Sequence, residues 1–276
     1  MNPYILPDGN VQIAFSGGRT SAYMLHQILE ANGGLPDRAR IVFNNTGRER
    51  NETLDFVQEC GSRWGVHVDW VEWHYKGFEL VSHNSASRNG EPFERLIQRR
   101  GFVPNRLSRF CTVEMKGRSA KFFLMSLGWE NWTCAIGIRA DEPKRLGKPQ
   151  PRERWTVYHP LAQAGVSRGD VVAWWGRQPF DLRLPVVNGN SSLGNCDGCF
   201  LKSEASLAAL AREEPERFAW WERMESLAAD RGATTGAQFR EGMSYRSLRQ
   251  FIDRQGDWIF DAEDALCQAD DGECTG

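Results

Sequence analysis

Val11-Gln-Ile-Ala-Phe-Ser-Gly-Gly-Arg-Thr-Ser-Ala-Tyr-Met-Leu25 is the stretch that decides the fold of this 276-residue chain. Its first five residues are rich in β-forming side chains and predict a buried strand. Ser16-Gly17-Gly18 predicts a sharp turn, because glycine tolerates positive φ. Thr20 and Ser21 suit the start of a helix, and the apolar residues that follow have helical spacing.

A turn of this kind between a strand and a helix is a favourable place for an anion. It points backbone N–H groups and the positive end of the helix dipole at one spot, where a phosphate most often binds. The alternative is a tight turn that only joins the strand to the helix. The glycine spacing of residues 16–21 is neither Gly-x-x-x-x-Gly-Lys nor Gly-x-Gly-x-x-Gly, which excludes those two types of phosphate-binding loop.

Composition is typical of a globular protein, with 41% hydrophobic and 25% charged residues. The length allows one large domain, or one domain with a substantial appendage. No apolar run is long enough for a membrane helix, and the N-terminal residues lack a basic stretch followed by an apolar one. We therefore expect a cytoplasmic protein with no membrane partner.

Net charge is −2, so the molecule as a whole is not built for nucleic acid, but its cations are unevenly placed. Between residues 95 and 121, Glu114 alone opposes eight basic residues: Arg95, Arg99, Arg100, Arg106, Arg109, Lys116, Arg118 and Lys121. A local positive face of this kind attracts phosphate-bearing ligands. The alternative is a solvated face balanced by acids elsewhere.

Short apolar runs alternate with amphipathic stretches over the first 160 residues. Strands are expected at 39–44, 66–73 and 132–138, and helices at 51–64 and 117–127. This alternation predicts an α/β fold in which helices sandwich a parallel sheet. Ligands bind beyond the carboxyl ends of such strands. The opening loop, Asn45-Thr46-Gly47 and residues 139–142 all follow expected strands.

The rest of the chain divides into two further parts. Residues 75–109 have poor periodicity and predict a long, partly mobile insertion that could act as a lid. Ser167 and Asp170 predict a capped helix start. Helices are expected at 203–212, 215–231 and 244–255. We therefore expect an α/β domain over 1–200, with a cysteine loop at 188–200, and a helical C-terminal extension over 201–276 with a frayed tail.

Seven cysteines, an odd number, argue against a disulfide framework. Cys196-Asp-Gly-Cys199 has the spacing of a metal, cluster or redox site. Its polar flank suits a ligand turn better than a thioredoxin-like motif. Zinc would require two more ligands, and Cys111 offers a third thiolate. Cys60 and Cys134 are expected in the core.

Three segments resemble the PAPS reductase-like family of the adenine nucleotide alpha-hydrolase (PP-loop) superfamily. Residues 16–21 resemble its Ser-Gly-Gly-x-x-Ser pyrophosphate loop, Asn45-Thr-Gly resembles its Asn/Asp-Thr-Gly segment, and Gly137-Ile-Arg139 resembles its Gly-x-Arg segment. One departure is Thr20, where the superfamily's ATP pyrophosphatases usually carry Asp. The resemblance covers about residues 11 to 200 and implies the Rossmann-like α/β fold of that superfamily.

The resemblance implies an adenine nucleotide, either ATP or PAPS/APS, bound by residues 1–200. Its implied contacts are Ser16, Gly17, Gly18, Arg19, Thr20, Ser21, Asn45, Thr46, Gly47, Gly137 and Arg139. Arg139 would meet phosphate or sulfate and take part in catalysis, since a guanidinium offers paired donors to adjacent oxygens. With ATP as the nucleotide, Asp141 or Glu142 could hold Mg²⁺.

Cluster-bearing members of the superfamily place one cysteine before a basic stretch and two in a later Cys-x-x-Cys. Cys111, Cys196 and Cys199 match these places and are the implied metal ligands of an iron–sulfur cluster. A cluster usually takes four thiolates, but some tRNA-thiolating relatives hold a 4Fe-4S cluster with three and leave one iron open to sulfur. Zinc and reduced structural thiols are the alternatives.

Cys274 lies in a Glu-Cys pair near the end of the chain. This pair resembles the start of the Glu-Cys-Gly-Leu-His tail on which sulfonucleotide reductases carry a nucleophilic cysteine. Gly-Leu-His is missing here. Cys274 is thus a predicted catalytic thiol, with a fourth cluster ligand or an inert tail residue as alternatives.

Two reactions of sulfur agree with this resemblance. One is reductive cleavage of a sulfonucleotide with a thioredoxin-like partner. The other is adenylation of an acceptor, a nucleic acid (tRNA or DNA) or a small molecule, followed by sulfur transfer from a donor such as a cysteine desulfurase. The incomplete tail opposes the first, Thr20 opposes the second, and the three-cysteine set favours sulfur transfer. A non-catalytic nucleotide-binding accessory protein is the further alternative.

Overall fold

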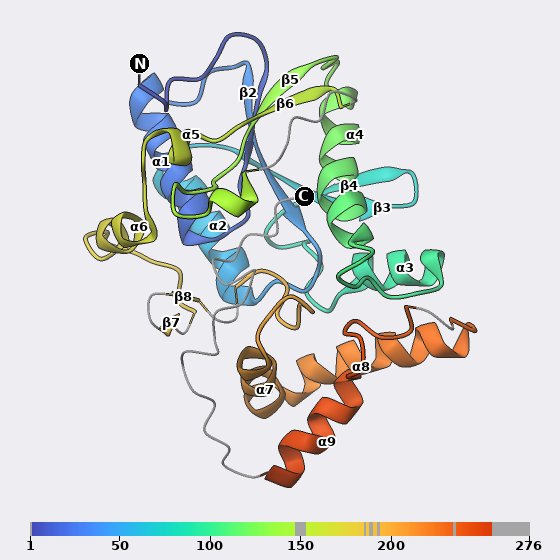
Figure 1. The fold of residues 1–276 in the computed structure, drawn as a ribbon. Helices are drawn as coiled ribbons and strands as arrows, with labels where there is room; N and C mark the ends of the chain where they lie inside the picture. The colour runs from blue at the N-terminus through green and yellow to red at the C-terminus, as the bar shows by residue number, and fades with distance from the viewer. Residues whose placement is uncertain are drawn as a thin grey trace.

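A six-stranded sheet in the order β4-β3-β2-β1-β5-β6 forms the centre of the computed structural model (Figure 1). The structure describes residues 2–146, 153–184, 186–187, 190–191, 194–233 and 236–255. The strands are β1 (Val11–Ala14), β2 (Ala39–Asn45), β3 (Val68–His74), β4 (Gly77–Val81), β5 (Trp132–Ala135) and β6 (Trp155–Tyr158). Every pair is parallel except β3 with β4. The expected α/β fold with a mostly parallel sheet is confirmed.

Helices cover both faces of the sheet. Successive side chains of a strand point to opposite faces. On β2, Ile41 and Phe43 accordingly pack with α1 (Arg19–Asn32), α2 (Asn51–Arg63) and α6 (Arg168–Trp175). Val42 packs on the opposite face with α4 (Ser119–Ser126).

Two of the cysteines lie in these two cores, as expected from the sequence. Cys60 on α2 is buried in the first core and Cys134 on β5 in the second.

The C-terminal part is helical, as expected, with α7 (Glu204–Glu213), α8 (Pro215–Asp230) and α9 (Tyr245–Gln255). These helices share a third core with Trp73, Phe93 and Phe110 from the α/β part of the chain. Two short strands, β7 (Val186–Val187) and β8 (Asn190–Ser191), pair antiparallel ahead of the cysteine turn. Within the described ranges, no helix has the length and apolar character needed to cross a bilayer.

Residues 75–109 differ from the expected loop without regular structure. They contain the edge strand β4 and the helix α3 (Glu91–Arg100). Phe93, Leu96 and Ile97 of α3 are buried in the third core, so this helix is anchored by packing.

Three short helical segments complete the described structure. A π-helix, η1 (Thr112–Arg118), runs directly into α4. The helical stretch expected at 117–127 therefore begins at residue 112, and its first part is a π-helix instead of an α-helix. The other short segments are η2 (Pro143–Arg145) and α5 (Pro160–Gln163). Ser167 forms the expected capping box with Asp170 at the start of α6.

Candidate functional site

The loop between β1 and α1 is tightly closed. Ser21 Oγ accepts a hydrogen bond from the Ser16 backbone N–H at 3.2 Å and lies 2.9 Å from Ser16 Oγ. Gly17 has φ +79°, and a Cβ there would lie 2.8 Å from Cγ2 of Thr53. Gly18 precedes the first residue of α1, and no side chain caps that helix end. The N–H groups of the first turn are therefore available to an anion.

Arg19 and Arg139 have different places around this loop. The Arg19 guanidinium binds both carboxylate oxygens of Asp181, at 2.7 and 2.6 Å, which anchors the start of α1. Arg139, only 3% exposed, donates to Thr20 Oγ1 at 3.3 Å. Gly137 is buried two residues before it, in the segment that leaves β5. The structure thus brings Thr20 and Arg139 together and directs the Arg19 side chain elsewhere.

Asp141 and Glu142, the expected Mg²⁺ ligands, both accept hydrogen bonds from Arg139 of their own segment. Asp141 Oδ1 accepts from Arg139 Nε at 2.9 Å, and Glu142 Oε2 accepts from the Arg139 backbone N–H at 3.1 Å. Burial alone would raise the pKa of Asp141. The backbone N–H of Arg168 and the Arg139 guanidinium outweigh it and hold that pKa below its usual value.

Asn45, Thr46 and Gly47 form a second loop at the carboxyl end of the sheet. Asn45 Nδ2 donates to Glu72 Oε1 at 2.6 Å, and Asn45 Oδ1 accepts from the Gly47 N–H at 3.1 Å. Glu49 accepts from the backbone N–H and the hydroxyl of Thr46. Burial raises the pKa of Glu49, against the opposing effects of Lys116 and Thr46.

The Cys-x-x-Cys turn lies against this second loop. Cys196 Sγ is 3.2 Å from Thr46 Oγ1 and 3.9 Å from Glu49 Oε1. Gly198, between the cysteines, has no room for a side chain, because a Cβ there would lie 2.3 Å from Trp221 Nε1. A helix of the C-terminal extension therefore shapes the turn that carries two of the predicted ligands.

Asp197, inside the same turn, is a fully buried junction of three parts of the chain. Its carboxylate accepts from Arg48 Nη2 at 2.7 Å, from Arg217 Nε at 2.5 Å and from Trp221 Nε1 at 2.8 Å. Arg48 directly follows the second loop, whereas Arg217 and Trp221 belong to α8. These contacts fix the cysteine turn against both.

The third predicted ligand, Cys111, directly precedes η1, and both Cys111 and Cys196 pack against the third core. In the ranges that the structure describes, no group of three or more His, Cys, Asp or Glu side chains is arranged to hold a metal ion. The three-cysteine ligand set therefore stays a prediction. Cys274 lies outside the described residues.

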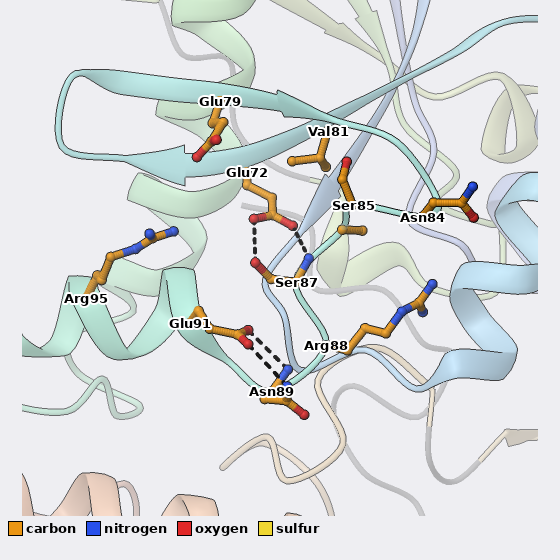
Figure 2. A pocket seen from close by; sticks show the side chains of 11 residues that line it. Glu72, Glu79, Val81, Asn84, Ser85, Ser87, Arg88, Asn89, Glu91 and Arg95 are labelled. Atoms are coloured by element: carbon orange, nitrogen blue, oxygen red, sulfur yellow. Dashed lines mark hydrogen bonds between the residues drawn. The ribbon is translucent and has the colours of Figure 1, made fainter.

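A polar cavity of about 450 Å³ adjoins the second loop (Figure 2). Glu72 of β3 forms one wall, where its carboxylate binds the backbone N–H and the hydroxyl of Ser87 in addition to Asn45. Arg95 enters from α3. The cavity thus shares the Glu72–Asn45 contact with the site loops.

Several residues of this site carried no signal in the sequence analysis. Arg48, Glu49 and Asp197 lie within or next to segments singled out there, but that analysis gave none of them a role. Their burial depends on Arg217 and Trp221, which are distant in sequence. The one local feature that could have indicated a buried ion pair is the position of Asp197, a charged residue between two cysteines.

Comparison with known proteins identifies relatives of this chain. The chain is 33% identical over 214 residues to the uncharacterized nin region protein ORF290 of Escherichia phage lambda, covering 73% of this chain and 69% of that protein. It is 26% identical over 265 residues to an uncharacterized 37.8 kDa protein of Escherichia phage 186, covering 81% of this chain and 77% of that protein.

Two solved structures are more distantly similar. One is a PAPS reductase from Candida auris, with TM-score 0.42 and 16% identity over 64% of this chain and 79% of that one. The other is the U34-tRNA thiolase NcsA from Methanococcus maripaludis with its [4Fe-4S] cluster, with TM-score 0.35 and 13% identity over 90% and 82% of the chains. Residues 10–162, more than half of the sequence, match the phosphoadenosine phosphosulfate reductase domain. The chain belongs to the phosphoadenosine phosphosulfate reductase domain family.

Proposed function

We propose that this protein is an enzyme that binds an adenine nucleotide and carries out sulfur chemistry beside it. The residues that would hold the nucleotide are the Ser16–Ser21 loop, the Asn45–Gly47 loop, Gly137 and Arg139. The observation that carries the proposal is the 3.2 Å contact between Thr46 Oγ1 and Cys196 Sγ. This contact joins the Asn45–Gly47 loop, which we propose to bind the nucleotide, to the turn that carries Cys196 and Cys199.

The reaction we favour is adenylation of an acceptor followed by sulfur transfer. The loop N–H groups would hold the phosphates of ATP, because the start of α1 has no side-chain cap. Arg139, already beside Thr20, would stabilise charge on the phosphate oxygens. Cys196 would lie near the activated acceptor because its turn is held against the second loop.

We also propose that Cys111, Cys196 and Cys199 bind an iron–sulfur cluster. Thiolates are the donors that such clusters take, and Cys111 and Cys196 contact one apolar core, which suits a protected cluster. A bound cluster would supply iron that can carry sulfur. Arg48, Arg217 and Trp221 would keep the turn in place through Asp197.

Product analysis tests the reaction. Anaerobically reconstituted protein is incubated with ATP and a nucleic-acid acceptor (tRNA or DNA), or with PAPS or APS and a thioredoxin. Release of pyrophosphate from ATP is expected. Sulfite from PAPS or APS would instead identify a sulfonucleotide reductase. Tight nucleotide binding with neither product would refute enzymatic activity and favour the accessory role.

Iron retention tests the cluster separately. Cys196→Ser is expected to lose the brown colour and most of the iron and acid-labile sulfide after anaerobic reconstitution, because one ligand is missing. The matched control is Cys134→Ser, which changes a thiol that is buried on β5, where burial raises its pKa to about 12. Equal iron and colour in both variants would refute the ligand assignment.

A further inference from the structure

The basic stretch between residues 95 and 121 is only partly neutralised in the fold. Glu114 pairs with Arg100 and with Arg118, and Lys121 pairs with Glu153 at 3.0 Å. Four arginines have no acidic partner among the residues described: Arg95, Arg99, Arg106 and Arg109. Glu91 and Glu94 lie in the first turn of α3, so the excess positive charge lies on the later part of this helix and on the segment that follows it, in a molecule whose net charge is −2.

These arginines lie on one continuous segment beside an exposed aromatic ring. Arg95 and Arg99 are one turn apart on α3. The Arg99 guanidinium lies 5.9 Å from the centre of the Trp73 ring, and the Tyr75 ring lies 5.1 Å from that of Trp73. Tyr75 is 50% exposed. Its open face can therefore stack on another planar group.

The segment after α3 carries the other two arginines, of which Arg106 is exposed and Arg109 is half-buried. Arg106 is exposed in a turn that is closed by the Asn105 side chain, which accepts the N–H groups of residues 107 and 108. Arg109 lies two residues before Cys111. Tyr75, Arg95, Arg99, Arg106 and Arg109 are called the arginine surface below.

The polar cavity adjoins the arginine surface through Arg95. Its volume of about 450 Å³ is within the range of about 300–1,000 Å³ that is typical of small-ligand sites. Carboxylate, hydroxyl, amide and guanidinium groups line it, so it offers both donors and acceptors. A nucleobase edge also carries both donors and acceptors.

We propose that the arginine surface binds a single-stranded nucleic acid and that the adjoining cavity receives one of its nucleotides. Arginines spaced along a surface match a phosphate backbone, an exposed ring stacks on bases, and a polar cavity reads a base edge. An acidic protein, as an alternative ligand, would match the positive charge but neither the exposed ring nor the polar cavity. The inference rests on the proposed function, in which this strand is the acceptor.

The test is fluorescence anisotropy with labelled single-stranded DNA and RNA oligonucleotides of mixed sequence, using the full chain without ATP or iron. The double variant Arg99→Gln/Arg106→Gln is expected to bind about tenfold more weakly at low salt. Loss of two phosphate contacts should also reduce the slope of log K against log salt by about 1.4. Tyr75→Ala is expected to weaken binding about fivefold or more with an unchanged salt slope, because stacking is lost.

Arg183→Gln is the matched control, since it removes an exposed arginine from a surface beside α2. It should bind as the unchanged protein does. Equal affinities for all variants, or binding of polyglutamate with the same affinity as the oligonucleotides, would overturn the inference. Because nucleotide and iron are absent from this assay, failure here would leave the proposed nucleotide chemistry to its own test.

Discussion

Gly17 is the residue on which the geometry of the opening loop depends. Its φ of +79° favours glycine, and a Cβ would press on the Thr53 methyl group at 2.8 Å and on Val57 at 3.0 Å. Both side chains belong to α2, whose packing on the sheet leaves them little freedom. The loop can therefore keep its shape only without a side chain at this position.

Gly17→Ala is expected to destabilise the protein by about 2–4 kcal/mol, combining backbone strain with overpacking, and to weaken the proposed ATP binding by at least tenfold. Urea unfolding and calorimetric titration measure the two effects. Gly33→Ala is the matched control, because Gly33 also has positive φ but has open space around it. It should cost only about 1–2 kcal/mol and leave ATP binding unchanged. Equal effects in both variants would contradict the role of the loop contact.

For single residues, the sequence analysis indicated that segments following strands of one parallel sheet lie close together. Thr20 and Arg139 both follow strands of the expected parallel sheet, and the structure pairs those strands, β1 and β5, directly. The contact between Thr46 and Cys196 was not indicated in this way, because 150 residues separate them and the turn that holds Cys196 is set by Trp221. No local pattern encodes that packing.

Among the elements, α8 holds the start of α9 through one buried carboxylate. Glu225 accepts the backbone N–H of Phe239 at 3.0 Å and that of Tyr245 at 2.7 Å. Burial raises the pKa of Glu225 to about 7, even though these two N–H groups lower it. A carboxyl whose pKa is higher in the folded state favours folding most at low pH.

The contribution of Glu225 is therefore complete below about pH 4.5 and is lost as the pH rises through about 7. In Glu225→Gln, the fall in unfolding free energy between pH 5 and pH 8 should be smaller by about 1–3 kcal/mol, because one pKa unit corresponds to about 1.4 kcal/mol. Urea unfolding at several pH values measures this. Glu216→Gln, at an exposed site on the same helix, should follow the unchanged protein. Parallel pH profiles for all three proteins would contradict the assignment.

Prediction of the helices and strands succeeded where the apolar pattern repeated over a long segment and failed where it covered only a few residues. α2, α7, α8 and α9 were expected close to their observed bounds. β4 has five residues at the sheet edge, and α3 has an apolar stripe of only Phe93, Leu96 and Ile97 among many charges. Their positions depend on the third core, to which distant helices contribute.

For the whole molecule, Asp197 is the point at which the sheet, the cysteine turn and the C-terminal helices meet. Both of its arginine partners, Arg48 and Arg217, are turned toward a carboxylate with 0% exposure. A buried charge that loses its partner is strongly destabilising, because water cannot replace that partner. The three parts are therefore expected to depend on one ion-pair network.

Asp197→Ala is expected to lower the free energy of unfolding by about 3–5 kcal/mol, as measured with urea. Asp181→Ala is the matched control, since that carboxylate also binds an arginine side chain through two hydrogen bonds but is 37% exposed. It should cost about 1 kcal/mol or less. A similar loss of unfolding free energy in both variants would contradict the prediction that burial makes the Asp197 ion pairs the more important ones.

The seven-residue π-helix between Cys111 and α4 has a consequence for how this protein family can vary. Hydrogen bonds in a π-helix span five residues instead of four, so it holds an extra residue in each turn. An α-helix rotates about 100° per residue. Deleting a single amino acid here would let the stretch close as an ordinary α-helix and would leave the thiol at nearly the same angle around the axis, because the wider turn already accommodates the extra residue. The π-helix can therefore gain or lose one residue while Cys111 keeps its direction relative to α4.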